Sequence, residues 1–426
     1  MATVSSLSRE RFALLFGVML VAAAGNTALQ SLMPSIGRQL GVPDLWVAAA
    51  FSLSAVIWVL TAPHWARRAD HRGRRALMRL GLYGFIASML VCGGALAAGL
   101  AGLIGPMAVF LIFIVGRAAY GAWGSASPPA VQAYIAARTE GAERTSALAT
   151  IASSFGLGTI AGPAIAPLFI FPPLGLSGPL IIFAVIGIAV LLAVVTRLPD
   201  DTPRSSARGQ IIGYPSLGDM NSGAGSDDQD WSPATLAWRD PRVFGWHMIG
   251  AIGGHGQAAL FGVIGFLVID RLRVSPSEAQ QWIAIVLMSG AAATLLAQWG
   301  LIPRLGLDPR RLVLWGCLLS ALGAIIIGIA AGMYGITLGF ALASLGFGFF
   351  RPGYTSGASL AVTRSEQNRV AGMVTSVNGI AFIGAPAAAV ALYSLSKALP
   401  FFVTAALLVA LTFWVWLRFI PSDQAA

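Results

Sequence analysis

Stretches of about twenty consecutive, mostly apolar residues recur twelve times along the chain. A helix of that length crosses the roughly 30 Å hydrocarbon core of a bilayer, because each helical residue adds about 1.5 Å. Only 10% of the residues are charged, whereas soluble domains contain about 25%. We therefore expect an all-α integral membrane protein. The predicted spans are 11–33, 45–64, 76–98, 104–136, 146–170, 177–196, 243–269, 279–302, 311–331, 334–362, 369–393 and 398–419.

Basic residues are distributed unevenly among the connections between these spans. Of 26 arginines and one lysine, 21 lie in alternate connections or at the span ends beside them, four lie in the other connections and two lie deep inside spans. Cationic residues accumulate in the cytoplasmic loops of membrane proteins. This predicts a multi-pass protein of a bacterial-type inner membrane with both termini in the cytoplasm. The net charge of +10 is then explained by topology, so no nucleic-acid partner is expected.

A polar segment divides the chain into two halves. Residues 198–240 are rich in Ser, Gly, Pro and Asp and contain no long apolar run, which predicts a cytoplasmic linker. Residues 1–197 and 241–426 are each expected to form a bundle of six helices. Three features recur in both halves at offsets of 223 to 226 residues, as an internal duplication predicts. They are Gly124…Pro128 with Gly348…Pro352, Arg138-x-Glu140 with Arg364-x-Glu366, and Pro163 with Pro386.

The connection after span 45–64 contains one carboxylate among six arginines, in the pattern Asp70-x-x-Gly73-Arg74-Arg75. Glycine permits a backbone conformation there that a larger residue would resist. A carboxylate at this place can bind the positive end of a neighbouring helix and pair with arginines, which would close the cytoplasmic side by a reversible contact. The alternative is a basic loop that only determines topology.

Two further motifs lie inside spans. Span 104–136 contains Arg117-x-x-x-Gly121-x-x-Gly124, and span 146–170 contains Gly158-x-x-x-Gly162-Pro163. An arginine at membrane depth is costly unless it meets a partner or water, so Arg117 is a candidate for function. The alternative is an arginine that only binds neighbouring carbonyls. Small residues one turn apart permit close helix contact, and proline bends the helix.

These three motifs together resemble those of the major facilitator superfamily. The first resembles the signature between its second and third helices, the second the helix 4 motif of its proton-linked exporters, and the third the antiporter motif of its drug:proton exporter branch. The resemblance implies two pseudo-symmetric six-helix bundles and no enzymatic activity. It also implies that Asp70 latches the gate with Arg74 and Arg75, that Arg117 serves proton coupling or substrate recognition, and that the third motif favours export.

Acidic residues are missing from the centres of the predicted helices. Exporters of cationic drugs in the family that this chain resembles usually have an acidic residue on the first helix, whereas this chain has Asn26 and Gln30 there. Arg117 and Arg351, in contrast, are the two arginines deep inside spans. A guanidinium is well shaped for binding carboxylate or phosphate. The pattern therefore favours an anionic substrate.

Other polar and aromatic residues of the spans complete the predicted pathway. His255 lies among glycines where the helix could loosen and could carry the coupling proton, although a hydrogen bond to the helix backbone explains it equally well. Gln257 and Asn378 could add neutral hydrogen bonds, and Trp58, Tyr120, Trp123 and Phe155 could supply apolar walls. The two cysteines, Cys92 and Cys317, each lie within a span, so neither a metal site nor a disulfide is expected.

The sequence therefore predicts a monomeric transporter that expels a small amphipathic or anionic molecule, either drug-like or a carboxylate-type siderophore or metabolite, in exchange for protons. No phosphate-binding loop of the GxxxxGK[ST] type is present, so the proton gradient is the expected energy source and no cofactor is expected. One alternative is an importer or uniporter of organic anions on the same fold. The other is a membrane sensor or scaffold that transports nothing.

Overall fold

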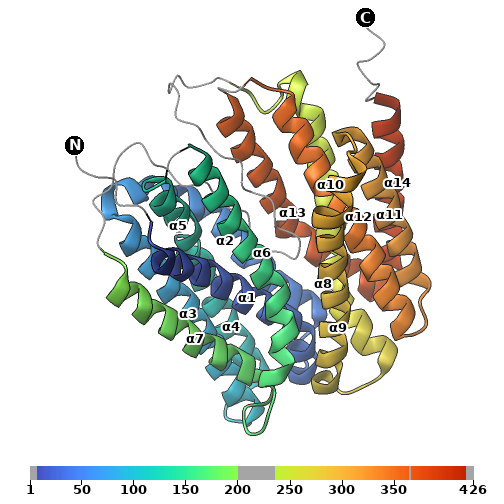
Figure 1. Cartoon of the computed structure of the whole chain (residues 1–426). Coiled ribbons are helices and arrows are strands. Elements are labelled where there is room, and N and C mark those ends of the chain that lie inside the picture. The colour runs from blue at the N-terminus through green and yellow to red at the C-terminus, as the bar shows by residue number, and fades with distance from the viewer. Residues whose placement is uncertain (1–6, 140, 200–235, 364–365, 419–426) are drawn as a thin grey trace, which may run out of the picture. The chain divides into compact units, whose positions relative to one another are not determined.

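The computed structural model describes residues 7–139, 141–199, 236–363 and 366–418, and all regular structure in these ranges is helical (Figure 1). The described helices belong to two compact units. The first contains the described residues up to 199 together with Ser275–Ala284. The second contains residues 236–274 and those from 285 onward. Most of the predicted linker, 198–240, lies outside the described residues.

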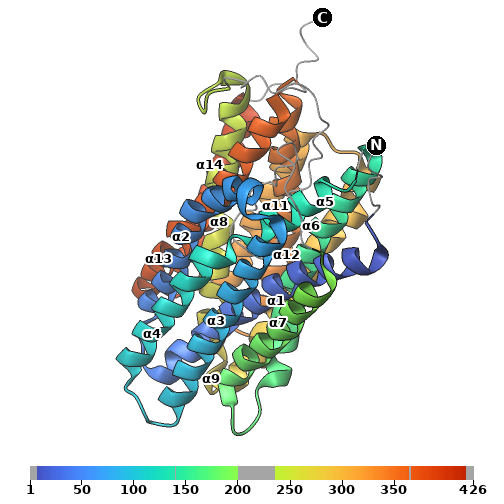
Figure 2. The ribbon, with the colours of Figure 1, turned by 90° about the vertical axis from the view of Figure 1, so that its left-hand side faces the viewer.

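The helices of the first unit make up six spans. They are α1 (Arg9–Leu40), α2 (Asp44–Arg72), α3 (Arg74–Leu100), α4 (Pro106–Ala119), the π-helix η1 (Tyr120–Gly124), α5 (Ser127–Ala136), α6 (Gly141–Ile165), the 3-10 helices η2 (Ala166–Phe169) and η3 (Gly175–Ser177), and α7 (Gly178–Arg197). A single span contains α4, η1 and α5. Figure 2 shows α3 beside α4 and α7, which are its main packing partners.

The remaining helices make up the other six spans, and they belong to the second unit except for the part of α9 up to Ala284. They are α8 (Pro241–Leu272), α9 (Pro276–Leu295), the π-helix η4 (Leu296–Leu301), α10 (Ile302–Leu305), α11 (Pro309–Ile329), α12 (Met333–Leu360), α13 (Gln367–Leu395) and α14 (Leu399–Arg418). Again one span combines three elements, α9, η4 and α10. Within this unit α11 packs mainly on α12, and α8 packs mainly on α13.

The predicted twelve-helix membrane fold is confirmed. In the described part of the chain, eleven helices are long and apolar enough to cross a membrane. The remaining predicted span, 146–170, corresponds to α6 and η2, whose apolar part Leu157–Phe169 is shorter. Capping residues mark several helix starts, because Ser8, Asp240 and Asp308 each accept a hydrogen bond from a backbone N–H of the following turn.

Glycines bring α6 into close contact with α1. A Cβ at Gly158 would lie 2.4 Å from the carbonyl oxygen of Leu20, and one at Gly162 would lie 2.1 Å from that of Ala24. Thr27 on α1 also donates from Oγ1 to the Gly158 carbonyl at 3.4 Å. The motif Gly158-x-x-x-Gly162 is therefore the surface through which α6 packs on α1, as small residues at helix contacts permit.

The first turns of α9 contact α1 of the first unit through one amide side chain. Gln280 is fully buried and donates from Nε2 to Ser31 Oγ at 3.2 Å, while its Oε1 accepts from Ser35 Oγ at 3.4 Å. Ser31 and Ser35 lie one turn apart on α1, so one amide can reach both hydroxyls. This contact helps to explain why Ser275–Ala284 group with the first unit.

Candidate functional site

Arg117 lies in the last turn of α4 and is completely buried. Its Nη2 donates to Asn26 Oδ1 on α1 at 2.9 Å and to Ser54 Oγ on α2 at 3.3 Å. The guanidinium carbon also lies 4.7 Å from the ring centroid of Phe51 and 4.9 Å from that of Tyr120. Two neutral hydrogen-bond acceptors and two aromatic faces thus stabilise the cation inside the first unit.

The structure brings together three of the residues predicted for the pathway in the first half, Asn26, Arg117 and Tyr120. The ring of Tyr120 is buried against Trp58 of α2 and Phe85 of α3, at centroid distances of 5.4 and 6.2 Å. Gln30 lies one turn after Asn26 on α1 and is half-buried. Trp123, in contrast, is 45% exposed. Sequence reasoning missed the contribution of Ser54, whose serine hydroxyl is too common to stand out.

In the second unit, Arg351 is also buried, with only 6% of its surface exposed. It lies on α12 between two aromatic residues that pack against glycines of α8. A Cβ at Gly253 would lie 2.1 Å from the ring of Phe350, and one at Gly250 would lie 2.5 Å from the ring of Tyr354. The hydroxyl of Tyr354 donates to Asn378 Oδ1 on α13.

The glycines around His255 do not open the helix in this structure. α8 is continuous from Pro241 to Leu272, and its glycines instead provide room for the rings of α12. Nδ1 of His255 lies 2.7 Å from the carbonyl oxygen of Ala251, one turn earlier. This contact corresponds to the backbone-bonded alternative for His255, and proton transfer by this residue stays a prediction. Gln257, two residues further, is buried.

The turn between α2 and α3 has the backbone conformation that the glycine predicts. Gly73 adopts φ +84° and ψ 138°, which residues with a side chain rarely adopt. Arg74 is buried, and Arg75 donates from Nη2 to the carbonyl of Val195 on α7. The side chain of Asp70 lies outside the described part of the structure, so its latch with the two arginines stays a prediction.

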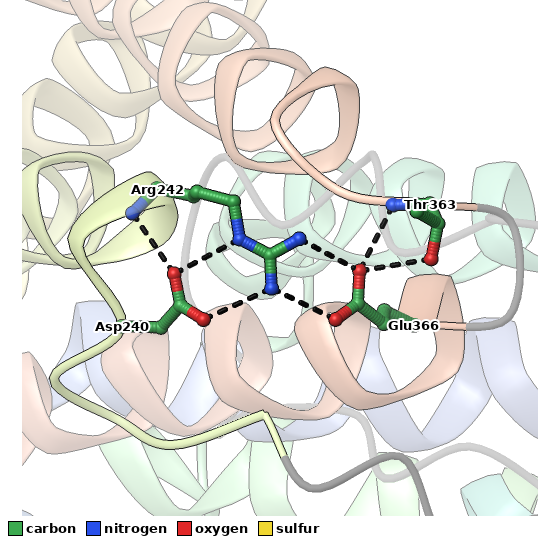
Figure 3. A network of polar contacts seen from close by, with 4 residues as sticks. All are labelled: Asp240, Arg242, Thr363 and Glu366. Atoms are coloured by element: carbon green, nitrogen blue, oxygen red, sulfur yellow. Dashed lines mark hydrogen bonds and ion pairs between the residues drawn. The ribbon is translucent and has the colours of Figure 1, made fainter.

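A polar network joins the start of α8 to the segment between α12 and α13 (Figure 3). Arg242 binds Glu366 through two hydrogen bonds, with Nη1–Oε2 3.1 Å and Nη2–Oε1 2.8 Å, and it binds Asp240 through Nε and Nη2. Thr363 donates to Glu366 from both its backbone nitrogen and its hydroxyl.

This network shifts the acidity of both carboxyl groups. The hydrogen bonds from Arg242, followed by those from Thr363, lower the pKa of Glu366 from 4.5 to about 2. Arg242 likewise holds the pKa of Asp240 below its ordinary value. The sequence repeat identified Glu366 but not its partner. The Asp240-Pro241 pair could have indicated the helix start that places Arg242 there, because Asp before Pro is typical of a capped helix N-terminus.

No three His, Cys, Asp or Glu side chains gather in a way that could hold a metal ion within the described residues. Away from the surface, the described part of the two units offers buried guanidinium groups, amides and hydroxyls, together with the buried imidazole of His247 and the half-buried imidazole of His255. Such groups can bind an anion and exchange hydrogen bonds with it.

Comparison with known proteins identifies several similar molecules. Residues 14–306 match the family model for the Major Facilitator Superfamily. A crystal structure of the human organic anion transporter MFSD10 (TETRAN) is 19% identical with a TM-score of 0.64, and the match covers 96% of this chain and 100% of that one. The nucleoside transporter NupG is 14% identical with a TM-score of 0.67, covering 96% and 99%.

A bacterial homologue of the human lysosomal transporter Spinster, in an inward-facing and occupied conformation, is 12% identical with a TM-score of 0.72, and the match covers 95% of each chain. No curated relative matches the sequence. At these identities the three structures share the fold with this chain, and their substrates are not transferred to it.

Proposed function

Because the chain belongs to the Major Facilitator Superfamily, it is a secondary transporter and not an enzyme, and we propose that it exports a small amphipathic or anionic molecule in exchange for protons. The substrate class includes drug-like compounds and carboxylate-type siderophores or metabolites. The proposal places this transporter in an inner membrane with both termini in the cytoplasm, following the distribution of its arginines.

The observation that supports an anionic substrate is the complete burial of Arg117. Two of its hydrogen-bond acceptors, Asn26 and Ser54, are neutral groups that stabilise the cation by hydrogen bonding. Arg351 supplies a second buried guanidinium in the other unit. Positive charge that is already desolvated attracts an anion more strongly than exposed charge does, because less water screens the interaction. A cationic substrate would meet repulsion from both groups.

Support for proton-coupled export comes from two features. The α6 motif that resembles the antiporter motif of exporters packs closely against α1, which also carries the Arg117 partner Asn26. His255 provides an imidazole, a side chain that can accept and release a proton, inside a helix of the second unit. A displacement of α6 would thus be transmitted to α1 and to the environment of Arg117.

One observation favours a second candidate, an organic-anion importer or uniporter. Nδ1 of His255 lies at hydrogen-bond distance from the Ala251 carbonyl, an arrangement that satisfies this nitrogen without any proton transfer. A carrier of that kind would use Arg117 and Arg351 for the substrate alone.

Flux into proteoliposomes distinguishes the two candidates. The anionic probe is 6-carboxyfluorescein, the cationic probe is ethidium, and the dye retained is measured after lysis at one fixed pH. With the vesicle interior more acidic than the medium, we expect protons to leave and carboxyfluorescein to accumulate inside. Ethidium uptake should be no faster than in protein-free vesicles. Carboxyfluorescein flux that is indifferent to the direction of the gradient would favour the uniporter. Ethidium transport without carboxyfluorescein transport would refute the anionic substrate.

Substitutions connect this flux to the two arginines. Arg117→Ala and Arg351→Ala should each abolish carboxyfluorescein transport at unchanged expression. Arg418→Ala is the matched control, because it removes an arginine from an exposed position at the end of α14. If both interior variants transport the dye at the parent rate, the arginines do not recognise the substrate.

A further inference from the structure

Three side chains of α2 lie within hydrogen-bond distance of backbone carbonyls of the span that contains Arg117. Ser54 Oγ donates to the carbonyl of Arg117 at 3.0 Å. Thr61 Oγ1 lies 3.0 Å from the carbonyl oxygen of Gly121 and 2.9 Å from Ser125 Oγ, and it also lies 2.8 Å from the carbonyl oxygen of Ile57 in its own helix. Trp65 Nε1 donates to the carbonyl of Ala122 at 2.6 Å. Residues at intervals of seven and four lie on one face of a helix, so α2 presents these three donors as a row.

The carbonyls that receive these bonds belong to or adjoin the π-helix η1. A π turn forms hydrogen bonds from residue i to i+5, so it widens the helix and changes which carbonyls find a partner within it. Carbonyls away from water need another donor. Close approach of α2 is possible because position 121 is glycine, where a Cβ would lie 2.6 Å from the carbonyl oxygen of Ser54.

Ser54 contacts Arg117 at both of its ends. Its hydroxyl donates to the backbone carbonyl of Arg117 and accepts from the guanidinium Nη2 at 3.3 Å. One hydroxyl can do both, because it has a single proton to donate and two lone pairs to accept with. The guanidinium also lies over Phe51 of α2 and over Tyr120, the first residue of η1. The hydrogen bonds of Arg117 with Ser54 and its contacts with the two rings therefore depend on the positions of α2 and of the π turn.

We propose that Ser54, Thr61 and Trp65 are positioning residues that hold the π turn against α2 and so hold Arg117 in the orientation that recognises the substrate. The inference rests on the proposed role of Arg117. It also makes α2 a connection between two motifs. The helix ends at Arg72, directly before Gly73 of the Asp70-x-x-Gly73 turn, and Gly73 lies eight residues after Trp65. A movement of that turn reaches Arg117 through α2.

Hydrogen exchange of the purified, substrate-free protein tests whether α2 holds the π turn. We expect the amides of residues 121–126 to exchange faster in Thr61→Val and in Trp65→Phe than in the parent, and Thr61→Ser to restore slow exchange. Thr196→Val is the matched control, because Thr196 contacts carbonyls of its own helix, α7, as Thr61 does, but has its described hydrogen bonds within that helix, whereas Thr61 also reaches Gly121 of η1. Unchanged exchange in both α2 variants would overturn the proposal.

Transport kinetics then test whether this hold serves recognition. With carboxyfluorescein as the probe, Thr61→Val should raise KM about fivefold with little change in the maximal rate, because one hydrogen bond contributes about 1 kcal/mol. Thr61→Ser should return KM to the parent value, which a general loss of stability would not allow. An unaltered KM in Thr61→Val, despite faster exchange, would overturn the positioning role. A parent that transports ethidium but not carboxyfluorescein refutes the anionic substrate, and the exchange measurement still decides whether α2 holds η1.

Discussion

Substitution of Gly162 by alanine tests the contact between α1 and α6. The new methyl group would lie 2.1 Å from the carbonyl oxygen of Ala24 and 2.6 Å from Oγ1 of Thr27. The threonine side chain can rotate, but the carbonyl belongs to the α1 backbone. The two helices must therefore separate by about an ångström to restore van der Waals contact.

The expected free-energy change combines two opposing effects. Overpacking costs about 1–3 kcal/mol, and the upper end applies because the clash is with backbone. Alanine is favoured over glycine inside a helix by up to about 1 kcal/mol. The net destabilisation of Gly162→Ala is then about 2 kcal/mol. Gly384→Ala is the matched control, because this glycine of the related Gly384-x-Pro386 motif on α13 has no atom within 4 Å of its would-be Cβ.

The two cysteines of the chain provide the assay. Cys92 on α3 and Cys317 on α11 are both fully buried, so a thiol-reactive fluorophore reports their exposure on heating. In a Cys317→Ala background, Cys92 alone reports unfolding of the first unit. Gly162→Ala should lower this midpoint by about 4–8 °C, since 1 kcal/mol corresponds to about 2–4 °C for a unit of this size. With Cys317 as the reporter, Gly384→Ala should leave the midpoint unchanged or raise it. An unshifted midpoint in Gly162→Ala would refute the packing argument.

Three further predictions concern polar contacts and the turn after α2. The pKa of Glu366 is lower in the folded protein than its ordinary value of 4.5, so the ion pair with Arg242 stabilises the fold above pH 4.5 and this stabilisation is lost as the pH falls towards 2. Glu366→Gln should therefore reduce the acid sensitivity of the unfolding midpoint that Cys317 reports. A pH profile identical to that of the parent would contradict the ion pair. Gly73→Ala should destabilise the first unit by about 1–3 kcal/mol, because φ +84° with ψ 138° strains any residue with a Cβ; a parent-like Cys92 midpoint would show that the turn adopts another conformation. Gln280→Leu leaves Ser31 without its amide partner at a cost of about 1–3 kcal/mol, and hydrogen exchange on the first turns of α9 should accelerate; unchanged protection there would exclude a stabilising role for the amide.

The order and positions of the helices follow from the sequence alone, because a bilayer demands that each span be long, apolar and internally hydrogen-bonded. Each of these requirements concerns residues that are neighbours in sequence, so the sequence alone shows where it is met. The predicted span 45–64 and the observed α2 (Asp44–Arg72) differ mainly at the C-terminal end, where a segment with several basic residues continues the helix past its apolar part. The unusual backbone conformation at position 73 was also predictable, because it depends on the glycine at that position.

Interhelical contacts, in contrast, were decided by the tertiary structure. Arg117 was identifiable as a buried cation, but its partner Asn26 lies 91 residues away, and Glu366 lies 124 residues from Arg242. Such pairs depend on the rotation and depth of each helix, which packing against other helices determines. The π turn after Arg117 is of the same kind, since two of its carbonyls accept hydrogen bonds from side chains of α2, a helix about 60 residues earlier in the chain. The sequence by itself thus determined the number, length and order of the spans and which residues carry unusual charge, and the folded structure decided which side chains hold that charge in place.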